Sequence, residues 1–98
     1  MSPEAIAIYE PLLAEQERSL GAEHPNTLGT RHNLAVAYLH AGRVPEAIAI
    51  FEPLLTQFER IFGPAHPDTL STRHQLAVAR LSVGPPGPVL GSVSGAAK

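Results

Sequence analysis

The sequence TLGTRHNLAVAYL, residues 27–39, is repeated 42 positions later as TLSTRHQLAVARL, residues 69–81. The segment before each of them is also duplicated, because residues 4–13 read EAIAIYEPLL and residues 46–55 read EAIAIFEPLL. Across residues 3–42, 26 of 40 positions hold the same amino acid as the position 42 places later. We call two positions that are 42 residues apart copies of one another. A fixed period of this length indicates one structural unit written twice and predicts stacked repeats.

Composition narrows the classes of protein to which the chain can belong. With 98 residues, 44% of them hydrophobic, it has the size of one domain. The net charge is -2 and the 7 Lys and Arg residues are scattered, so the sequence does not predict nucleic-acid binding. Because there is no cysteine, disulfides, thiolate nucleophiles and cysteine-ligated zinc are excluded.

The sequence carries no sign of membrane insertion or export. No apolar run reaches the roughly 18 residues of a membrane-spanning helix. The first ten residues, MSPEAIAIYE, carry an acid where a signal peptide has a positive cluster. We therefore expect a cytoplasmic protein without a membrane partner.

Apolar spacing and Pro/Gly punctuation predict an all-α chain of four helices, at about residues 3–20, 26–41, 45–62 and 68–83. These helices form one segment, residues 1–84. The remaining residues 85–98, PPGPVLGSVSGAAK, predict a disordered tail. Pro11 and its copy Pro53 lie inside the first and third helices. Since an internal proline removes one hydrogen bond, we expect a kink there rather than a break.

Turns and apolar stripes are repeated as well. GAEHP at residues 21–25 and GPAHP at residues 63–67 each end one helix with glycine and start the next with proline. His24 and His66 precede those prolines and are predicted to take cap positions. The inner stripe of the second helix is expected to contain four residues: Leu28, Leu34, Ala35 and Tyr38.

These features resemble the tetratricopeptide repeat, in particular the 42-residue variant found in kinesin light chains and many bacterial regulatory proteins. The resemblance rests on NLAVAY at residues 33–38, on Gly42, on EAIAIFEPLL and on FERIFGPAHPDTL at residues 58–70, and it covers residues 3 to about 83. It implies antiparallel helix pairs, with segments 26–41 and 68–83 as first helices and 3–20 and 45–62 as second helices. The chain then holds one complete pair between two half-units.

Five positions depart from the family pattern. They are the internal prolines Pro11 and Pro53, Arg31 and Arg73 where a large apolar residue is common, and Arg80 in place of Tyr. We expect Arg31 and Arg73 to bury their stems and to pair with a carboxylate. The acids considered for this role are Glu10, Glu52 and Glu59.

The resemblance also implies a binding surface on the concave face. In that family this face is lined by the first helix of each pair, which we call a first-type helix. We expect the partner-binding residues to be His32, Asn33, Val36 and His40, with their copies His74, Gln75 and Val78. Asn33 resembles the family's peptide-contacting asparagine, and its amide can donate to a carbonyl and accept from an N–H group. A simpler interpretation, that this is a solvated helix face, stays open.

No catalytic, cofactor or metal site is predicted. His24, His32 and His40 are eight residues apart rather than at the i, i+4 spacing of helical metal ligands, and HExxH does not occur. His66 and His74 repeat the same spacing. The matched acids are explained by the repeat, and no Gly-rich phosphate loop follows a strand. We therefore do not expect an enzyme.

The sequence predicts a protein–protein interaction module, part of a scaffold or regulator, whose partner is a peptide or another protein. Since repeat arrays generally need about three units to be stable, two alternatives stay open. In one, the end helices pair with another copy and the chain is an oligomerisation element. In the other, it is a truncated remnant of a longer array. The outer copies are more polar, as terminal repeats tend to be: Gln16 for Phe58, Ser19 for Ile61, and Arg80 for Tyr38.

Overall fold

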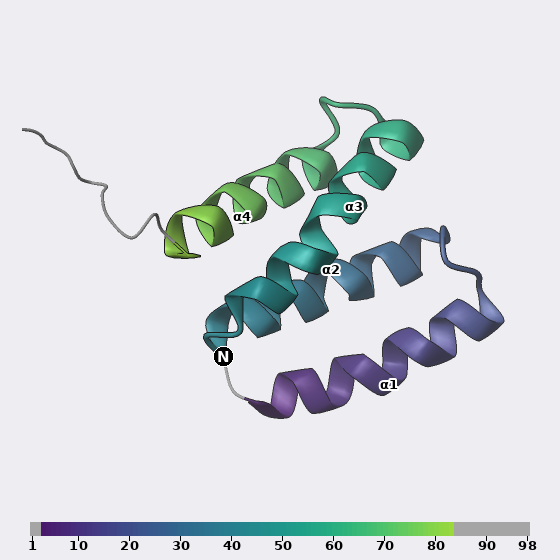
Figure 1. Ribbon diagram of the computed structural model, residues 1–98. Coiled ribbons are helices and arrows are strands. Elements are labelled where there is room, and N and C mark those ends of the chain that lie inside the picture. The colour runs from purple at the N-terminus through teal and green to yellow at the C-terminus, as the bar shows by residue number, and fades with distance from the viewer. Residues whose placement is uncertain (1–2, 84–98) are drawn as a thin grey trace, which may run out of the picture.

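The structure, a computed structural model, describes residues 3–83. They form four α-helices joined by short turns: α1 (Pro3–Ser19), α2 (Pro25–His40), α3 (Val44–Phe62) and α4 (Pro67–Val83). Consecutive helices run in opposite directions and pack one after another (Figure 1). The predicted all-α fold is therefore confirmed. The tail predicted to be disordered lies outside the described residues.

α2 and α4 begin at Pro25 and Pro67, one residue earlier than the sequence had suggested, and α3 begins at Val44, one residue before Pro45. Pro25 and Pro67 occupy the first helical position, where the missing N–H group has no partner to lose. His24 and His66 cap these helices as predicted. Nδ1 of His24 accepts from the backbone N–H of Asn26 at 3.1 Å, and Nδ1 of His66 accepts from that of Asp68 at 3.0 Å.

The end of α2 explains why this helix stops at His40 and not at Ala41. Gly42 has a φ of 81°, in the left-handed region that favours glycine. The backbone N–H of Arg43 donates to the carbonyl of Tyr38 at 2.8 Å, and that of Gly42 donates to Leu39 at 3.1 Å. This pair of bonds is the Schellman arrangement, which satisfies the last carbonyls and turns the chain toward α3.

Both α1 and α3 continue past their internal prolines without a break. A proline leaves the carbonyl four residues before it without a helical donor, here Ala7 and Ala49. Pro11, Pro53 and these two alanines are all exposed, so water can satisfy the free carbonyls. The kink expected at the two prolines stays a prediction.

The core consists of two clusters. The first is built from α1, α2, α3 and α4: Ile6, Leu34, Ala35, Ala37, Tyr38, Ala47, Phe51, Leu76 and Ala79. The second contains Leu28, Leu54 and Phe58. The predicted stripe of α2 is buried in them. α2 contacts the other three helices, whereas α1 does not contact α3.

Each arginine within the first-type helices reaches back to the preceding helix. Arg31 pairs with Glu17 at 3.0 Å and Arg73 pairs with Glu59 at 2.8 Å, so the contact is repeated 42 residues later. Glu59 was among the acids predicted for this role, but Glu17 was not. The prediction missed Glu17 because it named Glu59 without also naming the equivalent acid 42 residues earlier. Arg31 also donates to Gln57 of α3 at 3.1 Å.

The other two acids predicted as arginine partners have a different role. Glu10 accepts from the hydroxyl of Tyr38, and Glu52 pairs with Arg80 at 2.8 Å. Within residues 3–83, neither forms an ion pair with Arg31 or Arg73. The prediction was wrong for them because they lie seven residues before Glu17 and Glu59, two helical turns further from the two arginines.

Candidate functional site

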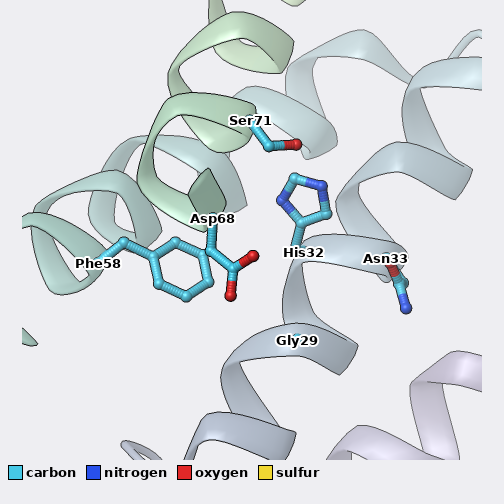
Figure 2. A pocket seen from close by; sticks show the side chains of 6 residues that line it. All are labelled: Gly29, His32, Asn33, Phe58, Asp68 and Ser71. Carbon is cyan, nitrogen blue, oxygen red and sulfur yellow. The ribbon is translucent and has the colours of Figure 1, made fainter. Parts of the chain in front are cut away.

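A pocket lies where α2, α3 and α4 meet (Figure 2). Its walls are Gly29, His32, Asn33, Phe58, Asp68 and Ser71, and its volume is about 170 Å³. Sites for drug-sized ligands and cofactors are larger, at about 300–1,000 Å³. The space therefore suits one side chain of a partner better than a small-molecule cofactor.

His32 forms a fixed wall of this pocket. Its Nδ1 lies 3.0 Å from the hydroxyl oxygen of Thr72, a fully buried residue of α4. The imidazole ring also meets the ring of Phe51 edge-on, with 5.6 Å between centroids. Burial lowers the pKa of His32 below 6.5, and the nearby carboxylate of Asp68 opposes the shift without reversing it. His32 is therefore neutral at pH 7 and supplies a rigid, uncharged ring.

Asp68 supplies the charge. It lies in the first turn of α4, where its carboxylate is favoured by the helix dipole, and its side chain is exposed. Its backbone N–H group donates to the capping His66, which holds this turn in place. Figure 2 shows the carboxylate of Asp68 between the ring of Phe58 and the ring of His32. The pocket thus combines one negative charge with two ring surfaces.

The structure distributes the predicted site residues unevenly. His32 and Asn33 both line the pocket, and Asn33 is exposed, with a side chain that points away from the His32 ring (Figure 2). Val36 is half-buried and packs against the first cluster. The remaining predicted residues do not line the pocket: His40 and His74 are exposed, and Gln75 and Val78 are half-buried.

Four pocket residues were not predicted: Gly29, Phe58, Asp68 and Ser71. The prediction chose one helix position and its copy, which places His32 and His74 on the same side of α2 and α4. The pocket instead takes Gly29 and His32 from α2 and Asp68 and Ser71 from α4, and it does not include His74. Gly29 lies one turn before His32 and is the copy of Ser71, so the spacing did contain a signal for these two positions.

The histidines do not assemble with acids. Among residues 3–83, no three His, Asp or Glu side chains gather as metal ligands would. In the same range, no helix has both the length and the apolar character needed to cross a bilayer. The arrangement offers a small polar and aromatic recess.

A family profile matches most of the chain. The profile of the Tetratricopeptide repeat family matches residues 2–52 and, shifted along the chain, residues 27–84. The two matches together span the four helices. A search of curated proteins found no match.

Proposed function

Because the chain belongs to the tetratricopeptide repeat family, whose members act as protein–protein interaction modules, we propose that it binds an extended peptide segment of a partner protein. The peptide lies along the face of α2 and α4. His32, Asn33, Val36 and His40 contribute from α2. The contribution of α4 comes from His74, Gln75 and Val78.

The pocket between α2, α3 and α4 is the observation that carries this proposal. Its volume of about 170 Å³ accepts one side chain of the peptide. The carboxylate of Asp68 favours a cation there, and the ring of Phe58 offers apolar surface to a long aliphatic stem. We therefore propose Lys or Arg as the side chain bound in the pocket. The exposed amide of Asn33 at the rim suits the peptide backbone, because it can donate and accept.

A role within a scaffold or regulator in the cytoplasm is the broader part of the proposal. It is supported by the 42-residue period, which resembles that of kinesin light chains, and by the absence of cysteine. A preformed helical surface also suits peptide capture, since little ordering of the receptor opposes binding.

A display library of random peptides, selected on the full-length chain, tests the proposal. We expect the selected peptides to share a Lys or Arg at one position. Gly29→Leu should then abolish binding by filling the pocket, because a Cβ at Gly29 meets no heavy atom within 4 Å and the helix can accept it. Asp68→Asn should weaken binding about tenfold, or 1.4 kcal/mol, while preserving the fold, since Asn26 occupies the copied position.

A matched control comes from α3. Thr56 is exposed and does not line the pocket, so Thr56→Ala should leave the affinity unchanged. Selected peptides that bind Gly29→Leu as tightly as the unchanged chain would overturn the pocket proposal. A library that yields no peptide above background would overturn peptide binding altogether.

A further inference from the structure

The two first-type helices are copies of one another, yet they bury different residues. Leu28 of α2 is 0% exposed, whereas its copy Leu70 in α4 is 48% exposed. Ala35 is fully buried, whereas its copy Ala77 is exposed. The reason is that α3 covers this side of α2, and no element within residues 3–83 covers the same side of α4. We call that side the α4 flank.

The helix at the other end shows the complementary difference. α1 is the copy of α3, but Leu54 of α3 is 0% exposed and its copy Leu12 is 40% exposed. Ile50 is half-buried, and its copy Ile8 is 64% exposed. α1 packs on α2 as α3 packs on α4. The side of α1 that corresponds to the side of α3 facing α2 is covered by no helix within residues 3–83. We call it the α1 flank.

We propose that these flanks bind one another between two copies of this chain, which stack head to tail. α1 of the second copy packs on α4 of the first in the way that α3 packs on α2 within the chain. Leu12 of the second copy then meets Leu70, just as Leu54 meets Leu28 in the second cluster. This inference uses surfaces outside the peptide pocket and is independent of the proposed function.

Charge complementarity supports the same register. Arg31 has partners on both neighbouring helices, Glu17 on α1 and Gln57 on α3. Its copy Arg73 pairs with Glu59 on α3. The copy of Gln57 is Glu15, so stacking brings a carboxylate to the open side of Arg73. An arginine thus meets an acid where the internal junction has a neutral amide.

The stacked junction is weaker than the internal one. Gln16 stands where Phe58 stands in α3, so the second cluster loses its aromatic member at the junction. We therefore expect association that depends on concentration rather than a permanent assembly. Because the contact joins two different surfaces, each added copy presents a new α4 flank, and the stack can grow.

Stacking also extends the peptide-binding face. It places His74 against Thr30 of the next copy, in the relation that His32 has to Thr72. The recess between α4 and α2 of the next copy then has Gln16 and Asn26 of that copy where the pocket has Phe58 and Asp68, so it lacks the aromatic ring and the carboxylate.

Sedimentation velocity of the full-length chain over about a hundredfold range of concentration tests the stack. The unchanged chain should grow in mass with concentration. Leu12→Glu blocks the α1 flank and Leu70→Glu blocks the α4 flank, and each variant alone should remain monomeric. A mixture of the two variants should form a dimer that does not grow, because one partner offers its α4 flank and the other its α1 flank.

Several results would overturn the proposal. They are a monomeric unchanged chain at every concentration, a mixture of variants that stays monomeric, and self-association of either single variant, which indicates a symmetric contact. Neither leucine belongs to a core cluster, so both variants should show the unchanged helical circular dichroism. If either unfolds, Glu15→Arg is measured alone in place of the mixture, because a second cation opposite Arg73 should reduce self-association without altering a buried residue.

Discussion

The hydroxyl of Tyr38 on α2 donates a hydrogen bond to the carboxylate of Glu10 on α1. Forty-two residues later, Arg80 reaches Glu52 in the same relation at 2.8 Å. The repeat therefore keeps the acid and changes its donor. Tyr38 is 8% exposed and joins the first cluster, whereas the side chain of Arg80 is 58% exposed. The inner contact is anchored in the core and the outer one is open to water.

This difference predicts unequal costs when the donors are removed. Tyr38→Phe should lower the free energy of unfolding by about 1 kcal/mol, since it deletes a hydrogen bond from a buried ring. Arg80→Gln should cost less than about 0.5 kcal/mol, because exposed ion pairs are screened by solvent. Urea denaturation measures both values. Equal losses for the two variants would contradict the difference in burial.

The same bond predicts an alkaline titration. The hydrogen bond to Glu10 raises the pKa of Tyr38 above 10.0, and burial raises it further. The folded chain thus keeps a proton that the unfolded chain releases, so this stability is present below about pH 10 and is lost as pH rises through the folded pKa. Glu10→Gln should bring the pKa of Tyr38 down only part of the way, because burial remains. The absorbance titration of the chain minus that of Tyr38→Phe isolates this tyrosine.

His32 predicts a pH dependence on the acid side. Because its folded pKa lies below the 6.5 of the unfolded chain, the unfolded state binds more protons between the two values. Stability is therefore full above pH 6.5 and falls as pH drops toward the folded pKa. Urea denaturation at pH values between about 8 and 5 should show this slope. His32→Gln should reduce the slope, whereas His74→Gln, at the exposed copy, serves as the control. A slope unaltered in His32→Gln would refute the assignment.

Removing either capping histidine should also lower the free energy of unfolding. His24→Ala and His66→Ala each remove the acceptor at a helix start and should lower the free energy of unfolding by about 1 kcal/mol. His66→Ala should cost more, because the ring of His66 also stacks on Phe62 at 4.7 Å. His24→Asp should restore most of the loss, since its carboxylate accepts from the same N–H group. If His40→Ala, an exposed control, costs as much, capping is not the cause.

Much of the fold was predictable because the sequence contains two copies of each helical pattern. The periodicity of Leu28, Leu34 and Tyr38 is local information, and the turns carry glycine and proline at matched positions. The cap by His24 was also readable, since the residue before a proline is driven out of helical geometry. In contrast, the acid that Arg31 selects depends on how α1 crosses α2. That crossing is a tertiary relation, which local spacing does not contain.

The candidate site was predictable only in part for a related reason. His32 and Asn33 could be predicted because they are polar residues on the helix that resembles the one lining the concave face in the family. Phe58 reads as a core residue, and Asp68 reads as a favourable first-turn acid. Both interpretations are correct locally. Only the packing of α3 and α4 on α2 shows that these two side chains also border the same recess.

The internal prolines Pro11 and Pro53 should make the helices that contain them less stable. In a helix interior, proline costs about 3 kcal/mol through a lost hydrogen bond and a clash with the preceding turn. At Pro11 and Pro53 both side chains are exposed, so alanine leaves no cavity behind. Pro11→Ala and Pro53→Ala should therefore each raise the free energy of unfolding by about 1 kcal/mol or more. The gain should be smaller than the full cost of an internal proline, because the carbonyls of Ala7 and Ala49 are exposed and water can satisfy them. Pro45→Ala, in the first turn of α3, should change it little, since that position has no helical partner to gain. Urea denaturation of the three variants at one low protein concentration measures these changes. A loss of stability in Pro11→Ala and Pro53→Ala would contradict the prediction, and it would mean that α1 and α3 need a bend at their prolines to pack against α2.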